Sequence, residues 1–182
     1  MFAHLVAECL SRQAQSRVPE PELSGIDSLA QDEAFELAGR EDGILASIYL
    51  YHAMQIAPLV CPGDRVLDLG CGPANQLVQV ARLSPQAAFT GIELSAGMLR
   101  CAHRTIERCG ASNVEAVRGD MTTLAGFPDG SFDCVISTLS LHHLPDEAAL
   151  ACALHAVRRV LKPGGGLYLV DFGRLKRART QR

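Results

Sequence analysis

At 182 residues the chain is long enough for one domain with a buried core and short for two. Its formal net charge of −3, with no sustained basic stripe, predicts no nucleic-acid partner, although five basic residues crowd the last nine positions. No apolar run approaches the roughly 20 residues of a membrane span, and no basic segment precedes the first apolar stretch, so we expect a soluble, cytoplasmic protein without membrane contacts.

Seven cysteines are scattered along the chain, an odd number without any C-x-x-C pair. This arrangement offers no zinc or redox motif, so the sequence predicts no metal site. We interpret most of the cysteines as small buried hydrophobic residues.

The first 30 residues, 1–30, read as an N-terminal arm or a loosely docked helix, because two prolines and a glycine interrupt any periodicity. The compact domain is expected over residues 31–182, with its core at 60–172. Asp32 is a candidate cap for a short helix through Leu37, and apolar residues at helical spacing follow at 44–59. The domain therefore begins with a helical prelude.

After this prelude, short apolar runs bounded by turn residues alternate with helical patterns. The expected strands lie at 65–70, 87–93, 113–120, 131–138 and 166–172. The expected helices lie at 74–83, 95–110 and 145–165, the second of them capped by Ser95. Alternation of this kind predicts an α/β fold with a doubly wound, mainly parallel sheet.

The stretch "RVLDLGCGPANQ" at 65–76 places Gly70 and Gly72 where the first strand turns into a helix. In open parallel sheets ligands bind outside the carboxyl ends of the strands, at such a turn. Glycine allows the backbone to turn sharply and a ligand to approach the chain closely. A glycine pair by itself is equally typical of a tight turn that binds nothing.

Acidic residues end the next two expected strands. Glu93 follows Gly72 by 21 residues, close to the spacing of about 20 at which a carboxylate reaches the hydroxyls of a ribose. Asp120 ends the third strand, where its carboxylate is placed to accept a hydrogen bond from the exocyclic amine of adenine. A glutamate at a strand end is also a common surface feature, so the pattern matters more than either residue.

The third glycine of the dinucleotide fingerprint is replaced by Asn75. Its absence, together with the negative charge of Asp68, disfavours a pyrophosphate and suits a ligand with a positive charge. An NAD-dependent oxidoreductase is therefore the less favoured alternative, and adenosine with a cationic arm is the expected ligand.

The motifs "VLDLGCG", "GDM" at 119–121, "FDCVIST" and "VLKPGGGLYLVDF", together with Glu93, resemble the class I S-adenosylmethionine-dependent methyltransferases. The resemblance covers about residues 60–172 and implies a Rossmann-like sheet with strand order 3-2-1-4-5. It also implies S-adenosyl-L-methionine as the cofactor and a small molecule as the methyl acceptor.

At the methionine end of the cofactor, the resemblance implies contacts from Asp68, Gly70 and Gly72. It further implies that the backbone of Ser137 and Thr138, after the fourth strand, holds the methionine amine and borders the methyl group.

At the nucleoside end, the resemblance implies that Glu93 binds the ribose hydroxyls. Met98 and Met121 would flank the adenine, and Asp120 would meet its amine.

The stretch "LSLHHLPDE" supplies His142 and His143 beside the expected position of the methyl group. A general base is needed only if the acceptor carries a proton, and His142 is the candidate. Alternatively, both histidines cap or brace the following helix.

Class I methyltransferases usually continue beyond the fifth strand with a helix and an antiparallel hairpin. In this sequence only ten residues follow Phe172. We therefore expect either a fragment or an incomplete sheet whose fifth strand promotes self-association. A truncated, catalytically incomplete cofactor-binding module is the main alternative to an enzyme. Arsenite is disfavoured as acceptor because the loop after the fourth strand lacks cysteine, and lipid-quinone, polyketide, amine and carboxylate acceptors stay open.

Overall fold

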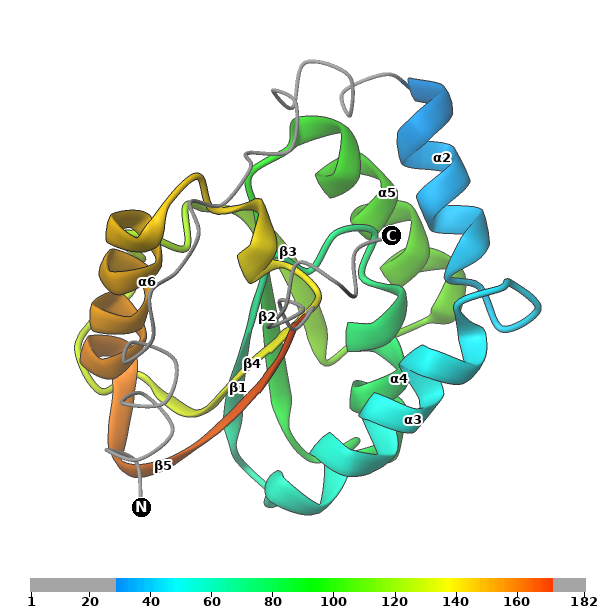
Figure 1. Cartoon of the computed structure of the whole chain (residues 1–182). Coiled ribbons are helices and arrows are strands. Elements are labelled where there is room, and N and C mark those ends of the chain that lie inside the picture. The colour runs from blue at the N-terminus through cyan, green and yellow to red at the C-terminus, as the bar shows by residue number, and fades with distance from the viewer. Residues whose placement is uncertain (1–28, 172–182) are drawn as a thin grey trace, which may run out of the picture.

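A computed structural model describes residues 29–171, and its centre is a five-stranded sheet (Figure 1). All of its strand pairs are parallel, and the strand order is β3-β2-β1-β4-β5. The strands are β1 (Arg65–Leu69), β2 (Ala88–Glu93), β3 (Val114–Arg118), β4 (Phe132–Thr138) and β5 (Leu161–Val170). The predicted α/β class and strand order 3-2-1-4-5 are confirmed.

Helices cover both faces of the sheet (Figure 1). They are α2 (Leu29–Ala38), α3 (Ala46–Ile56), α4 (Asn75–Leu83), α5 (Ala96–Cys109) and α6 (Glu147–Val160), with short 3-10 turns η2 (Ala57–Leu59) and η3 (Leu141–His143). α3, α4 and α5 lie on one face, and α6 lies on the other. Within residues 29–171 no helix has the length and apolar character needed to cross a membrane.

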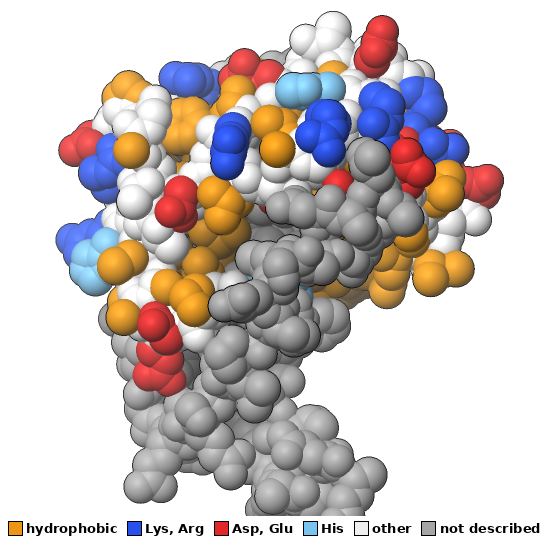
Figure 2. Space-filling view, turned by 90° about the horizontal axis from the view of Figure 1, so that it is seen from above, with side chains coloured by type: hydrophobic (Ala, Val, Ile, Leu, Met, Phe, Trp, Pro, Cys, Tyr) orange, Lys and Arg blue, Asp and Glu red, His pale blue; other side chains and the backbone are white. Residues whose placement is uncertain are grey.

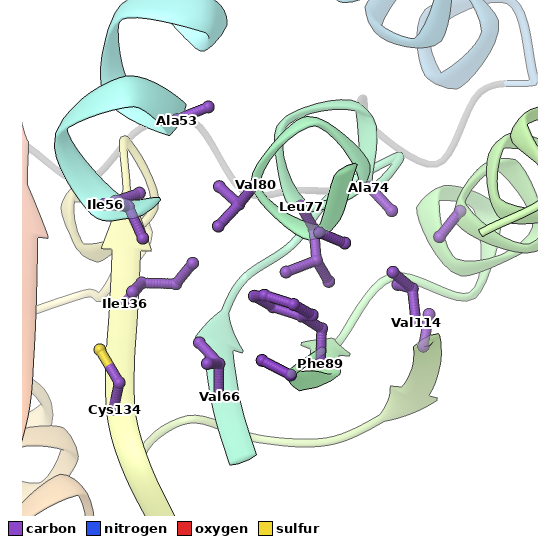
Figure 3. Close-up of a cluster of buried hydrophobic side chains, with 14 residues drawn as sticks. Ala53, Ile56, Val66, Ala74, Leu77, Val80, Phe89, Val114, Cys134 and Ile136 are labelled. Carbon is purple, nitrogen blue, oxygen red and sulfur yellow. The ribbon is translucent and has the colours of Figure 1, made fainter. Parts of the chain in front are cut away.

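The core beneath α3 and α4 is built from side chains that alternate along the strands (Figure 3). Phe89 of β2 points toward Leu77 of α4, and Ile136 of β4 points toward Ile56 of α3; all four are at most 1% exposed. Burying a side chain of this size is worth roughly 2 to 3 kcal/mol. This packing fixes α4, and with it the turn that precedes α4, against the carboxyl end of β1.

The opposite face of the sheet packs against α6. Val157 and Val160 of α6 contact the cluster that contains Leu67 and Leu69 of β1. Because β1 is covered on both faces, its side chains are buried from Val66 to Leu69, as expected for a central parallel strand. That burial explains the near-continuous apolar run in the sequence.

The N-terminal helices confirm the predicted helical prelude, but Asp32 lies inside α2 and not at its start, as a cap would. It lies in the first turn of α2, is 1% exposed, and packs against Gly97 in the first turn of α5. Only glycine leaves room for the carboxylate there. A negative charge beside a helix N-terminus is electrostatically favourable, so Asp32 joins two helices instead of starting one.

The boundary between the last helix and the last strand also differs from the prediction. α6 ends at Val160 and not near residue 165, because Pro163 and the following glycines do not continue a helix. β5 begins at once at Leu161, and an irregularity separates the pair Phe132–Leu161 from the pair Cys134–Gly166. Pro163 is tolerated because β5 is an edge strand.

The expectation that most cysteines are buried is wrong for the described part of the chain. Of the six cysteines there, Cys101 and Cys134 are buried, while Cys61 and Cys152 are exposed, and all six are free thiols. The predicted arm and the basic tail, at 1–28 and 172–182, lie outside the described residues.

Candidate functional site

The site is built around the turn between β1 and α4. Gly70 and Gly72 both adopt positive φ, +68° and +52°, a region that favours glycine. A side chain at Gly70 would lie 2.6 Å from Cβ of Ser140, so this position is crowded. A side chain at Gly72 would meet no atom within 4 Å, so this position faces open space that a ligand can enter.

Glu93, the last residue of β2, closes the turn from the neighbouring strand. Its carboxylate accepts hydrogen bonds from the backbone N–H of Gly72 at 3.0 Å and of Ser95 at 2.8 Å. The structure therefore brings together the glycine turn and the acidic residue that the sequence spacing paired. Ser95 caps α5 as predicted, since its hydroxyl accepts from the N–H of Met98 at 3.3 Å.

Asp68 lies beneath this turn and is only 7% exposed. Burial, and then the nearby charge of Glu93, raise the pKa of Asp68 to about 7. Burial, and then the nearby charge of Asp68, raise the pKa of the hydroxyl of Tyr49, which belongs to α3. A cationic group placed here would favour the ionised form of Asp68.

Ser137 and Thr138 are the last two residues of β4, inside the strand predicted at 131–138 and not after it. The Ser137 hydroxyl is fully buried, 3.3 Å from the carbonyl oxygen of Leu69 and 2.6 Å from the Ser140 hydroxyl. Thr138 Oγ1 accepts a hydrogen bond from Gln76 Nε2 of α4 at 3.0 Å. Ser137 thus links the end of β4 to the residue before the glycine turn, and Thr138 links it to α4.

The three residues expected at the adenine occupy different environments. Met98 is 7% exposed in the first turn of α5, and Met121 is half-buried with its terminal methyl beside Gly70. Asp120 is exposed and lies two residues beyond the end of β3, so it does not end that strand as predicted. Its Oδ1 accepts from the backbone N–H and the hydroxyl of Thr122 at 2.8 and 2.7 Å, which fixes the turn.

His142 is paired with Asp171, the residue that follows β5. Nδ1 of His142 lies 2.8 Å from Oδ1 of Asp171, and the backbone N–H of His142 donates to Oδ2 at 2.8 Å. The two side chains are 22% and 19% exposed. The N-cap of α6 is Asp146, so the histidines do not cap this helix, and the alternative that they brace it stays a prediction.

The sequence did not single out Tyr49, Ser140 or Asp171 as functional candidates. A signal for Asp171 was present, because it is an acidic residue at a strand end, like Glu93. Asn75 was noted only as a missing glycine, yet its buried amide donates to the carbonyl oxygen of Glu36 at 2.9 Å and holds α2 against the turn.

A separate hollow of about 420 Å³ lies between α2 and α5. Its lining residues are Glu33, Glu36, Leu37, Arg40, Arg104 and Arg108. The nearly buried carboxylate of Glu36 accepts from three guanidinium groups at 2.6 to 2.9 Å. Figure 2 shows basic side chains interspersed with acidic and apolar ones on the face seen from above. We interpret the ion pairs of Glu36 as a link between α2 and α5, and we call them the ionic clamp.

The chain matches the family model described as "Methyltransferase domain" over residues 66–165. A 37.1 kDa protein of transposon TN4556 from Streptomyces fradiae is 36% identical over 169 residues, 92% of this chain and 43% of that protein. Demethylmenaquinone methyltransferase of Listeria welshimeri is 36% identical over 110 residues, 60% of this chain and 45% of that enzyme. The chain thus spans less than half of the length of these curated relatives.

A similar fold occurs in phosphoethanolamine N-methyltransferase 2 of Haemonchus contortus, solved in complex with S-adenosyl-L-methionine. The likeness has a TM-score of 0.67 at 22% sequence identity, and it covers 81% of this chain and 34% of that one. At this identity the likeness establishes the fold.

Proposed function

Because this chain belongs to the methyltransferase domain family, within the class I S-adenosylmethionine-dependent methyltransferases, we propose that it transfers a methyl group from S-adenosyl-L-methionine to a small-molecule acceptor. One observation carries the proposal. The Glu93 carboxylate and the open side of Gly72 meet at the carboxyl ends of β1 and β2, joined by a 3.0 Å hydrogen bond. This is the place where open parallel sheets bind nucleoside ligands.

The residues at the turn fit the two ends of this cofactor. Glu93 offers carboxylate oxygens to the ribose hydroxyls, and Gly72 leaves the space that a nucleoside needs. Asp68, whose carboxyl group is buried, is suited to the positively charged methionine end. Met98 and Met121 supply the apolar surfaces on which adenine would lie.

Oδ2 of Asp120 would accept a hydrogen bond from the adenine amine, since in the described part of the chain only Oδ1 of this carboxylate accepts hydrogen bonds. The backbone of Ser137 and Thr138 stays a proposed border of the methyl group. The crowded Gly70 would shape the turn more than contact the cofactor.

When bound, the cofactor supplies an activated methyl group, so the chain has to align the acceptor and exclude water. We assign His142 as the general base for acceptors that carry a proton. Asp171 accepts from Nδ1–H, which makes Nε2 the basic nitrogen of the neutral ring. Asp171 also holds the backbone of His142, so both the tautomer and the position of the ring are fixed.

Quinol-type acceptors are the first to test, because the relatives of this chain include demethylmenaquinone methyltransferases. The partner is then a small molecule, the site needs no metal, and the cytoplasm is the expected compartment. The alternative is a module that binds the cofactor without turnover.

Turnover separates the enzyme from the binding module. The purified chain is incubated with S-adenosyl-L-methionine and quinol, polyketide, amine and carboxylate acceptors, and the adenosylhomocysteine formed is quantified. The proposal predicts acceptor-dependent product that falls at least tenfold in His142→Gln for protonated acceptors. Cofactor binding with no product from any acceptor would favour the binding module.

A further inference from the structure

The carboxyl end of β4 separates from β1 at the centre of the site. β1 and β4 pair through Asp68 and Ile136, and the ladder stops there. Beyond that point Ser137 and Thr138 pair only with β5 within the described sheet. The carbonyl oxygen of Leu69 therefore lacks a strand partner in β4.

Two serine hydroxyls replace that partner. Ser140 Oγ donates to the carbonyl oxygen of Leu69 at 2.6 Å, and Ser137 Oγ lies 2.6 Å from Ser140 Oγ. Both serines are buried, at 4% and 0% exposed. Buried hydrogen bonds of this kind specify one arrangement, since an unpaired carbonyl or hydroxyl would be costly there.

Ser140 also packs directly on the glycine turn. Its Cβ lies 2.6 Å from the position that a side chain at Gly70 would occupy, so the two residues fit each other only because Gly70 has no side chain. A movement of the turn at Gly70 toward Ser140 must therefore displace Ser140 or be stopped by it.

On its other side Ser140 begins the segment that carries His142. It precedes η3, and its carbonyl oxygen accepts from the N–H of His143 at 3.2 Å. The residue before it, Leu139, adopts a positive φ of 57° and is held by a 2.8 Å hydrogen bond from its N–H to Val170. Positive φ in leucine is strained, and such strain persists only where the surroundings fix it.

We propose that Ser140 is a positioning residue that couples the cofactor turn to the His142–Asp171 pair. Ser140 contacts the turn at Leu69 and Gly70, and because it directly precedes η3 it determines the position of His142. The inference rests on the proposed function, because it takes the turn as the cofactor site. The further proposal is that cofactor binding at the turn and the position of His142 depend on each other.

The test follows the ring resonances of His142 by NMR while adenosylhomocysteine is added to the full chain. We expect the ligand to shift these resonances in the wild type. Ser140→Ala should still bind the ligand, within about tenfold of the wild-type dissociation constant, but lose most of the shift. Ser137→Ala, which keeps the bond from Ser140 to Leu69, should lose only part of it.

Ser131→Ala is the matched control. Ser131 is buried just before the other end of β4, and its hydroxyl has no hydrogen-bond partner within the described residues. It should therefore keep the full shift.

Each outcome has one meaning. An equal His142 shift in wild type and Ser140→Ala would overturn the coupling and leave the proposed function intact. No binding by the wild type would overturn the proposed function and, with it, this inference. If Ser140→Ala does not fold, a full shift in Ser137→Ala overturns the coupling, and a partial loss supports it.

Discussion

Two carboxylates at the ends of neighbouring strands set the electrostatics of the site. Asp68 is buried beneath the glycine turn, and Glu93 lies beside it at the end of β2. Burial, reinforced by the charge of Glu93, raises the pKa of Asp68 from 3.8 to about 7. The site thus holds a carboxyl group that titrates near neutral pH and that a bound cation would ionise.

Asp68→Asn tests this charge through stability. Because the pKa of Asp68 is raised in the folded state, its protonated carboxyl group contributes fully to the free energy of unfolding below pH 4. This contribution is lost as pH rises toward 7. The variant should therefore be more stable than the wild type at pH 8, by up to about 4 kcal/mol, with the difference vanishing near pH 4. Urea unfolding at both pH values measures it, and a difference that does not change with pH would contradict the assignment.

Glu93→Ala and Glu115→Ala separate a ligand contact from a general loss of charge. Glu93 binds two backbone N–H groups at the turn, whereas Glu115 accepts from the Thr90 hydroxyl at 2.8 Å on the outside of β3. Loss of the ribose contact should weaken adenosylhomocysteine binding by 1.5 to 3 kcal/mol, roughly 10- to 150-fold. Glu115→Ala should leave the affinity within about twofold; equal losses in calorimetric titrations would remove Glu93 from the site.

At the scale of elements, an ionic clamp holds the N-terminal helices on the domain. Glu36 of α2 is 4% exposed and meets Arg40, Arg104 and Arg108. Burial alone would raise its pKa, but the hydrogen bonds from the three arginines outweigh burial and lower it to about 2. Because α2 also accepts a hydrogen bond from Asn75, the clamp supports the glycine turn.

Glu36→Gln should destabilise the chain by about 2 kcal/mol at pH 7. The value is below that of a fully buried pair because the arginine side chains are 39 to 49% exposed. The loss should disappear between pH 4.5 and 2, since a lowered pKa contributes stability only above that window. Glu33→Gln, in the same hollow, is the control, and equal effects in chemical unfolding would refute the clamp.

The elements show where sequence reasoning succeeds. Strand positions were predictable because β1, β2 and β4 are buried apolar runs that turn residues interrupt. The start of β5 was not, because the stretch at 161–165 contains proline and two glycines and joins the sheet only through pairing with β4. The pairing of Glu93 with Gly72 followed from spacing, whereas His142 and Asp171 are 29 residues apart and meet only through the sheet.

At the scale of the whole molecule, the sheet places every part of the site at the carboxyl ends of its strands. The order β3-β2-β1-β4-β5 brings the ends of β1, β2 and β4 together and leaves β5 at the margin of the described sheet. Leu167 and Leu169 of β5 pack toward α6 and are only half-buried. Edge strands of this apolar kind invite pairing with another chain.

We expect the purified chain to self-associate through this edge. Sedimentation velocity between about 5 and 100 µM should show a sedimentation coefficient that rises with concentration. Leu167→Lys, which adds a charge to the strand, should reduce the rise. A monomer at every concentration would show that β5 is not an association surface.

The central claim is that the turn of β1 binds S-adenosylmethionine, and calorimetric titration with adenosylhomocysteine tests it most directly. The account predicts one saturable site per chain and no comparable heat with NAD. It also predicts a gain of about 2.7 kcal/mol in unfolding free energy at a hundredfold excess over the dissociation constant. No binding at millimolar adenosylhomocysteine by a folded chain, or tighter binding of NAD, would contradict the account.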